Sequence, residues 1–420
     1  MELDELSQSG IRRVADYSPY LDQLAGLAHE MGLQQRSNLV HLERSLHQEW
    51  SLGQNTILSW AATHDGVQVL VVPHYAIAEY TSATNTTVPP DRRRVSSRFI
   101  TELISGNRQL TTQQMYKVSQ LLGVEPVAIP LRQPLSGNAA ESQIIERMVR
   151  RYGINYVASR AVTLFDIVGF SLLTPFEQMT QLNSLSYSLN SAHAKMLELD
   201  VGINFARSSS GDGFYIWNRD QGLEANVNLY HFMHIVLADN AIALRKATSN
   251  AVPRLRACFH VGSCYEFHQA EGLNPTIHNF IVGDVTIELA RMIEAAQPGQ
   301  ILVGDFFASL QRSDDDDSIE GEVNLDAVAF LERAQGNLAK LSGLELSGER
   351  VSAIKCYLTG KRLTSGEFDI RRLRIRDKHG LERTAYNAKV NIYRDSAEPI
   401  LLGIQDRKLS PNGADSLRSA

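Results

Sequence analysis

The spacing of apolar positions divides the chain into segments with different expected structures. Residues 1–135 mostly show the three-to-four-residue apolar repeat of helices, interrupted by a strand-like run at 67–73. Within this part, 96–126 predicts two short helices, because its apolar positions recur at helical spacing and Thr111 and Gln114 have the spacing of a capping box. We expect a mostly helical N-terminal domain.

The two short helices at 96–126 are similar to the end of a phage-repressor-like helix-turn-helix domain. Arginines gather near them: Arg92, Arg93, Arg94, Arg98 and Arg108. A DNA-binding head is one interpretation of this segment. A helical regulatory or dimerisation module with a solvated arginine face is the other, so binding to nucleic acid is left open.

The middle of the chain alternates between strand-like and helical patterns. Residues 136–158 predict a linker and a connecting helix, and a folded domain follows over 159–312. Its expected elements are a strand at 161–167, a helix at 176–199, a hairpin at 203–217, a helix at 222–247 and a strand at 255–261. This β-α-β-β-α-β order predicts an α+β fold, in which an antiparallel sheet of ferredoxin-like type carries its helices on one face.

The last part of the chain has shorter, strand-like patterns. An acidic run at 313–318 is typical of a solvated loop and marks the edge of the preceding domain. Alternating stretches at 373–376 and 389–393 then predict strands. We expect a small β-rich C-terminal domain at 345–410.

Composition limits the classes of protein that these elements form. The 420 residues are 43% hydrophobic and 21% charged, which excludes wholesale disorder and a fibrous repeat. The 41 basic and 47 acidic side chains give a net charge of −6, so any basic surface must be local. Three cysteines without C-x-x-C spacing favour a reducing compartment. No apolar run reaches the ~18 residues of a membrane span and the N-terminus is acidic, so we expect a cytoplasmic protein without membrane contact.

Four segments between 160 and 305 carry the residues that suggest chemistry. They are 165–170 (FDIVGF), 210–214 (SGDGF), 256–262 (RACFHVG) and 283–303. Together they resemble the catalytic domain of class III nucleotidyl cyclases, and the first is close to that family's F-x-D-I-x-G-F motif. The resemblance implies an enzyme with a ferredoxin-like cyclase domain at 159–312.

Asp166 and Asp212 are the candidate metal ligands. A nucleoside triphosphate carries about four negative charges, so two divalent cations held by two carboxylates neutralise it, activate the 3′-hydroxyl and stabilise the leaving pyrophosphate. The strand that ends at Asp166 and the hairpin that turns at Asp212 are neighbours in the expected sheet, which puts both carboxylates at one edge. The resemblance adds the carbonyl of Ile167 and implies two Mn²⁺ or Mg²⁺ ions per site.

The residues after the first aspartate are expected to contact the phosphates. Their backbone N–H groups are the candidates, at Val168, Gly169 and Phe170. Gly169 has no side chain to obstruct a phosphate oxygen, so the backbone can approach it closely.

Arg291 lies on a predicted helix between two glycine-containing turns. Counting inward from both turns gives the same alignment with the cyclase family, without a gap. On this alignment Arg291 stands where the family keeps an arginine that stabilises the transition state. The alternative is a surface ion pair of Arg291 with Glu288 or Glu294.

Three positions depart from the purine cyclases and form the candidate base and ribose pocket. Ser208 stands where they carry a lysine, Phe280 where they carry a base-reading aspartate, and Ile287 where an asparagine contacts the ribose. Phe280 cannot accept hydrogen bonds from a base, and Ser208 lacks the reach and charge of a lysine.

This combination resembles the pyrimidine cyclases of the bacterial Pycsar anti-phage system. The resemblance implies conversion of UTP to 3′,5′-cyclic UMP and pyrophosphate as a defence signal, with a phage-derived activator and a β-rich sensor at 345–410. It also implies a head-to-tail homodimer with active sites at the catalytic-domain interface, where one protomer supplies the metal ligands and the other supplies the arginine.

Other functions stay open at this stage. One is a cytidylate cyclase, which converts CTP to cyclic CMP, because no residue that we identify separates it from a uridylate cyclase. ATP and GTP are less favoured substrates than UTP and CTP. A non-catalytic nucleotide sensor joined to a DNA-binding head would bind nucleotide without turnover. A diguanylate cyclase shares the expected sheet, but Gly213 replaces the second acidic residue of its hairpin signature.

Overall fold

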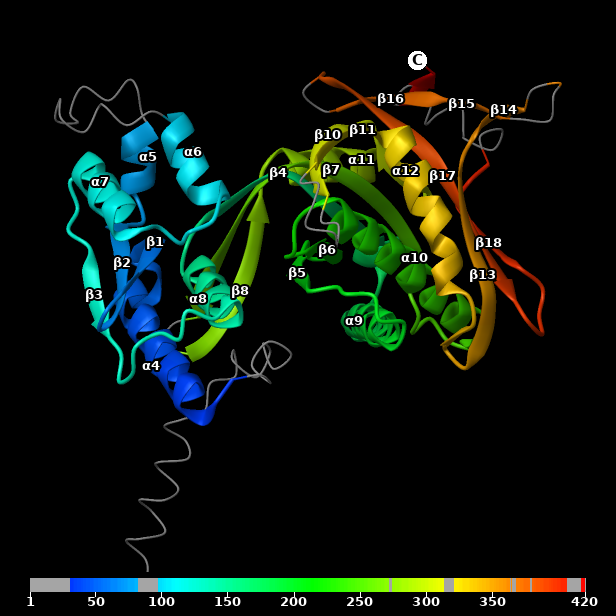
Figure 1. Ribbon diagram of the computed structural model, residues 1–420. Helices are drawn as coiled ribbons and strands as arrows, with labels where there is room; N and C mark the ends of the chain where they lie inside the picture. The colour runs from blue at the N-terminus through cyan, green and yellow to red at the C-terminus, as the bar shows by residue number, and fades with distance from the viewer. Residues whose placement is uncertain are drawn as a thin grey trace, which may run out of the picture. The chain divides into compact units, whose positions relative to one another are not determined.

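The computed structural model describes residues 31–81, 97–271, 274–312, 321–362, 364, 368–377, 380–405 and 417–419. The chain forms two compact units, one made of 1–156 with 265–280 and the other of 157–264 with 281–420. Figure 1 shows the elements of both units, coloured along the sequence from blue at the N-terminus to red at the C-terminus. Among the helices that are described, none combines the length and the apolar character that crossing a bilayer requires.

A three-stranded antiparallel sheet lies at the centre of the first unit. Its strands are β1 (Asn55–Thr63), β2 (Gly66–Pro73) and β3 (Val127–Pro130), in the order β1-β2-β3. The strand expected at 67–73 is therefore confirmed, and it has two neighbours that the apolar pattern did not predict.

Helices cover both faces of this sheet. They are α4 (Leu33–Trp50), α5 (Ala76–Thr81), α6 (Ser97–Ser105), α7 (Thr112–Leu122) and α8 (Ala139–Arg151), with a 3-10 turn at Ser51–Gly53. Consecutive residues of β1 point to opposite faces, so Ile57 packs with α4 and α8 while Leu58 packs with α5, α6 and α7. The first unit is thus a helix-sheet-helix sandwich.

The two helices expected at 96–126 are present as α6 and α7. The Thr111 hydroxyl accepts a hydrogen bond from the Gln114 N–H at 3.2 Å, and the Gln114 side chain accepts one from the Thr111 N–H at 2.8 Å. Gly123 ends α7 with a φ of 64°, in the left-handed region. The capping box and the glycine stop therefore act as the sequence predicts.

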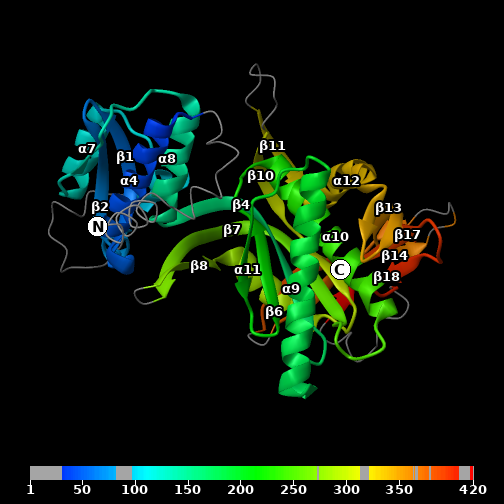
Figure 2. The ribbon, with the colours of Figure 1, turned by 90° about the horizontal axis from the view of Figure 1, so that it is seen from below.

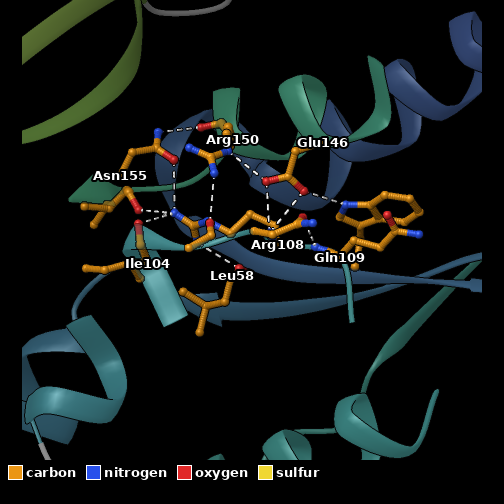
Figure 3. A network of polar contacts seen from close by, with 11 residues as sticks. Leu58, Ile104, Arg108, Gln109, Glu146, Arg150 and Asn155 are labelled. Carbon is orange, nitrogen blue, oxygen red and sulfur yellow. Dashed lines mark hydrogen bonds and ion pairs between the residues drawn. The ribbon is translucent and has the colours of Figure 1, made fainter. Parts of the chain in front are cut away.

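Arg108 is not part of a solvated arginine face, because its side chain is fully buried. Figure 3 shows its guanidinium among backbone carbonyls: Nη1 donates to Leu58 at 2.8 Å, and Nη2 to Ile104 at 3.0 Å. Nη2 also donates to the Asn155 side chain at 3.0 Å. Burial lowers the pKa of Arg108 to about 9. Arg108 therefore ties the end of α6 to β1 and to the strand that leaves α8.

The other arginines near these helices differ from Arg108. Arg98 is exposed and forms an ion pair with Glu102 at 2.8 Å. Three more arginines lie outside the described residues: Arg92, Arg93 and Arg94. The acidic run at 313–318 also lies outside them. The arginine face expected from the sequence therefore loses one member to the core.

The second unit contains the predicted β-α-β-β-α-β succession. Its elements are β4 (Asn155–Ile167), α9 (Pro175–Glu198), β5 (Phe205–Ser209), β6 (Gly213–Asn218), α10 (Leu223–Lys246) and β7 (Leu255–Glu271). The strands lie in the order β7-β4-β6-β5, and β6 is antiparallel to both β4 and β5. This interleaved order is that of a ferredoxin-like sheet, so the expected topology is confirmed.

Helices lie on both faces of this sheet. α9 and α10 pack on the face that carries Phe165, and α11 (Asp284–Ala295) packs on the opposite face, where Leu289 contacts the side of the sheet that carries Leu164. The expectation of helices on one face holds for α9 and α10 only. In Figures 1 and 2, α12 (Ala327–Asn337) lies alongside α10, and both contribute to one core.

The structure does not separate a small domain at 345–410. This segment is rich in strands, but its long strand β17 (Glu382–Arg394) pairs antiparallel with β9 (Ile301–Gly304). β9 in turn pairs parallel with β7. The remaining strands are β8 (Asn274–Val282), β10 (Phe307–Arg312), β11 (Gly321–Asp326), β12 (Leu344–Leu346), β13 (Glu349–Leu358), β14 (Gly360–Arg362), β15 (Phe368–Ile370), β16 (Arg372–Arg376), β18 (Ile400–Leu402) and β19 (Leu417–Ser419). The sheet continues as β7-β9-β17-β13-β12. Without β17, the edge of the buried β9 would present unpaired backbone groups.

Candidate functional site

Asp166 and Asp212 lie next to each other at one edge of the second unit's sheet. Asp166 is the second-to-last residue of β4 and is paired with Gly213 of β6. Asp212 lies in the turn between β5 and β6, and its carbonyl accepts a hydrogen bond from the Ile167 N–H at 3.0 Å. The two carboxylates that the sequence places at one edge are therefore brought together.

The turn that carries Asp212 depends on glycine. A Cβ on Gly213 would lie 1.9 Å from the carbonyl oxygen of Phe165, so no other residue fits between β6 and β4. Gly211 has a φ of 100°, and the Ser210 N–H donates to the Gly213 carbonyl at 3.0 Å. The small residues around Asp212 thus hold the aspartate against the end of β4.

Burial and two charged neighbours shift the pKa of Asp166. Its side chain is 6% exposed, and its Oδ2 accepts a hydrogen bond from Arg256 Nε at 2.6 Å. Burial raises the pKa of Asp166, the Arg256 guanidinium opposes that rise, and the nearby Asp212 carboxylate adds to it. The carboxylates of Asp166 and Asp212 therefore repel each other, and a bound cation would relieve this repulsion.

The donor set fits a magnesium-type site. Asp166, Asp212 and the Ile167 carbonyl supply oxygen, the ligand that Mg²⁺ and Mn²⁺ prefer. Within the described ranges, no three His, Cys, Asp or Glu side chains converge as a cage for a metal ion. A cation here would take its other ligands from water and from a substrate phosphate, as Mg²⁺ commonly does.

Arg256 lies at the candidate site, and the sequence analysis assigned it no role. It lies at the start of β7, where its Nε binds Asp166 and its Nη1 donates to the Ala296 carbonyl at the end of α11, 2.9 Å away. One side chain therefore connects the candidate metal ligand to the helix that carries Arg291. A basic residue directly before the buried core of a strand was the available signal.

The structure changes the candidate phosphate loop. The Val168 N–H donates to the Arg254 carbonyl at 2.9 Å, so it is already engaged. Gly169 has a φ of 71° and begins a short 3-10 turn at Phe170–Leu172. The phosphate-binding prediction therefore rests on Gly169 and Phe170, because Val168 holds the loop in place instead.

Arg291 has the acidic neighbour that its alternative interpretation proposed. Its Nη1 lies 2.9 Å from Glu294 Oε2, and its Nε lies 3.9 Å from Asp377 Oδ2 on the hairpin of β16 and β17. Glu288 forms its ion pair with Arg383 instead. The ion pair with Glu294 is thus present, and the proposed role on a nucleotide stays a prediction.

The remaining pocket candidates lie on separate elements. Ser208 of β5 is paired with Tyr215 of β6, whereas Ile287 is half exposed on α11. Phe280 belongs to the first unit, where its ring stacks on Phe267 with centroids 5.5 Å apart and an interplanar angle of 16°. The ring of Phe280 therefore already has a stacking partner.

Tyr215 is a second residue that the sequence did not single out. Burial raises the pKa of its phenol, as does the Asp212 carboxylate, whereas Arg291 lowers it. The phenol is therefore close enough to Asp212 and to Arg291 to respond to both charges. Tyr215 faces the same side of the sheet as α11.

Comparisons with known proteins give nucleotidyl cyclase domains. No family model matches the chain, and no curated protein matches it. Among solved structures, it is similar to the guanylate cyclase domain of RhGC from Catenaria anguillulae in complex with GTP, with 11% identity over 56% of this chain and 97% of that chain and a TM-score of 0.33. It is also similar to the adenylyl cyclase CyaB from P. aeruginosa. The identity is 14% over 41% of this chain and 96% of that chain, and the TM-score is 0.27.

A third similar structure comes from another lineage. It belongs to the adenylate cyclases from Trypanosoma brucei in their monomeric state, with 11% identity over 59% of this chain and 93% of that chain and a TM-score of 0.30. These neighbours are class III nucleotidyl cyclase domains of the guanylyl and adenylyl types. These TM-scores are low, so the function proposed below is derived from the strand order and from the two aspartates.

Proposed function

We propose that the protein is a metal-dependent nucleotidyl cyclase that converts UTP to 3′,5′-cyclic UMP and pyrophosphate. The observation that carries this proposal is the pair of carboxylates at the β4 end and the β5–β6 turn, where the pKa of Asp166 is raised by burial and by Asp212. Such a pair is poorly stable without a cation and has the oxygen ligands that a nucleotide–metal complex needs.

Each residue has a defined task in this reaction. Asp166, Asp212 and the Ile167 carbonyl would hold two divalent cations, which would make the 3′-hydroxyl more acidic and neutralise the phosphates. The 3′-oxygen loses its proton and bonds to the α-phosphorus, and the bond to the bridging oxygen breaks so that pyrophosphate leaves. The guanidinium of Arg291 would stabilise the charge on the α-phosphate.

The choice of a pyrimidine rests on the residues that are missing. Ser208 and Phe280 replace the two side chains with which purine cyclases of the resembled family read the base. The same replacement leads us to propose the wider role, a cyclic pyrimidine signal in anti-phage defence with a phage-derived activator. CTP is the competing substrate, because uracil and cytosine differ only at position 4 and in the protonation of N3.

The test is turnover of each triphosphate separately. Purified protein is incubated with Mn²⁺ and ATP, GTP, CTP or UTP, and products are identified by mass spectrometry. We expect cyclic UMP from UTP and none from Asp212→Ala. Cyclic CMP alone would correct the base, and a purine product would contradict the pyrimidine proposal.

A nucleotide sensor is the outcome to consider if no triphosphate is converted. The helices α6 and α7, on which that alternative depends, are present in the first unit. It predicts that the protein binds nucleotide without turnover and that its DNA affinity falls steeply with salt. Binding without turnover, together with that salt dependence, would replace the cyclase proposal.

A further inference from the structure

The α11 helix and the β16–β17 hairpin are joined by a row of alternating charges. Helix α11 presents Glu288, Arg291 and Glu294, which are three residues apart and so lie along one face of the helix. The hairpin presents Asp377, directly after β16, and Arg383 at the start of β17. We call these five residues the α11 charge row.

The signs in the α11 charge row alternate from one end to the other. Glu288 pairs with Arg383, whose Nη2 lies 3.6 Å from Asp377 Oδ2. The same Oδ2 lies 3.9 Å from Arg291 Nε, and Arg291 Nη1 lies 2.9 Å from Glu294. The Asp377 carboxylate therefore faces two guanidinium groups, one from its own hairpin and one from α11.

Asp377 is held in place independently of either arginine. Its Oδ1 accepts a hydrogen bond from the Leu381 N–H at 3.0 Å, and its own N–H donates to the Leu381 carbonyl at 3.0 Å. The Gly380 N–H donates to the Asp377 carbonyl at 2.9 Å. These hydrogen bonds to Gly380 and Leu381 hold the carboxylate at the position from which it faces the guanidinium of Arg291.

Burial makes this charge effective. The Asp377 side chain is 1% exposed and that of Arg291 is 18% exposed, so water and salt screen their attraction only weakly. Apolar side chains fix the hairpin on the helix at the same place, since Leu373 and Ile375 of β16 share a core with Leu289 and Met292 of α11. The hairpin and the helix thus form one packed element.

We propose that Asp377 is a positioning residue for Arg291, so that the β16–β17 hairpin belongs to the catalytic apparatus of the cyclase. The proposal rests on the function proposed above, because it assigns Arg291 to the transition state. The contacts that the described residues make with Arg291 use Nε and Nη1, so the N–H groups of Nη2 are the ones that would donate to a phosphate. A guanidinium fixed on one side loses little freedom when it binds on the other.

The proposal also changes the expected role of the C-terminal strands. β17 connects the hairpin to the catalytic sheet through β9, so a displacement of these strands would move Asp377 and with it Arg291. A signal that acts on the C-terminal segment would therefore change the rate of the chemical step.

The first test separates rate from binding. Asp377→Asn keeps the shape of the side chain and an acceptor for the Leu381 N–H, but it removes the charge. We expect kcat to fall by roughly 10- to 100-fold, with little change in KM for the triphosphate, because only the transition-state contact is disturbed. Asp377→Glu keeps the charge but moves it by one methylene, and should also lower kcat. This variant replaces Asp377→Asn as the test if the asparagine variant fails to fold.

A matched control lies on the same hairpin. Glu382 pairs with Arg374 at 3.8 Å across β16 and β17, and both side chains are more than half exposed. Glu382→Gln removes a carboxylate from the hairpin without touching α11 and should leave kcat within about twofold of wild type. An equal loss of kcat in E382Q and D377N, or a rise in KM with kcat unchanged, would overturn the proposal.

The second test does not depend on catalysis. Urea unfolding of wild type, D377N, Arg291→Gln and the double variant gives the coupling between the two side chains. We expect D377N to destabilise the R291Q protein less than it destabilises wild type. Additive effects would refute the contact even in an active enzyme, whereas clear coupling in a protein that converts no triphosphate would refute the proposed function alone.

Discussion

Asp166 is a buried carboxylate whose charge depends on a single basic neighbour. Burial and Asp212 both raise its pKa, and Arg256 opposes them from 2.6 Å. A metal ligand must be ionised, so the candidate site is expected to lose activity as the pH falls through the raised pKa of Asp166.

We predict that Arg256→Gln moves this acidic limit to higher pH. The substitution removes the group that lowers the pKa of Asp166 and leaves the two that raise it. The measurement is the pH profile of kcat/KM at one fixed, subsaturating Mn²⁺ concentration, where the acidic limb should shift to higher pH.

Lys195→Gln is the control for loss of a positive charge in the same unit. Lys195 pairs with Glu198 at the end of α9, at 2.9 Å. Its pH profile should match that of wild type. An unshifted acidic limb in R256Q, or an equal shift in K195Q, would contradict the assigned role of Arg256.

The sequence identified only part of the site at this scale. Asp166 and Asp212 each lie in a recognisable sequence motif. Their proximity follows from the pairing of β4 with the hairpin whose turn contains Asp212. Arg256 and the engaged N–H of Val168 carry no such signal, because each acts through a contact with a residue more than eighty positions away. Distant contacts of this kind leave no local pattern.

At the scale of elements, the close approach of β6 to β4 depends on one glycine. Gly213→Ala should lower the free energy of unfolding by about 1–3 kcal/mol, because its Cβ would lie 1.9 Å from the Phe165 carbonyl and the strands would have to separate. Urea unfolding measures this loss. A decrease in Mn²⁺ affinity should accompany it, since Asp212 is the adjacent residue.

Gly202→Ala serves as its control. Gly202 precedes β5 in the same unit, and a Cβ there would meet no atom within 4 Å. Its stability should stay within about 0.5 kcal/mol of wild type. Equal stability of G213A and G202A would show that the strands tolerate a side chain at 213 and would refute this account of the turn.

Elements with strong local signals were the predictable ones. The capping box at Thr111, the stop at Gly123 and the β-α-β-β-α-β order all came from spacing along the chain, and all are present. The three-stranded sheet of the first unit was only partly predicted. β3 is a four-residue strand whose partner β2 lies far earlier in the sequence, and β1 was not recognised as the first strand of a hairpin with β2.

At the scale of the whole molecule, the proposed dimer makes a sharp prediction. If metal ligands and arginine come from different protomers, Asp166→Ala and Arg291→Ala chains should each be inactive, and an equal mixture should recover roughly a quarter of wild-type activity. Half of the dimers would then be mixed, and each would contain one complete site of two. Cyclic UMP production after mixing measures the recovery.

The matched mixture combines Asp166→Ala with Asp212→Ala. Both substitutions damage the same half of the site, so this mixture should recover nothing. No recovery in the first mixture would argue for sites built within one chain. Recovery in both would show that exchange between protomers is not the cause.

The sequence by itself determined the ferredoxin-like strand order, the helix ends and the two aspartates, because these depend on local spacing and turn chemistry. The tertiary structure alone decided three further features: the burial of Arg108, the pairing of β17 with β9, and the placement of Asp377 beside Arg291. The alternating pattern of 345–410 predicts strands but not their neighbours, because a strand's partner is chosen by which sheet edge is open. The 345–410 segment, expected as a separate sensor, is therefore joined through β17 to the sheet of the second unit.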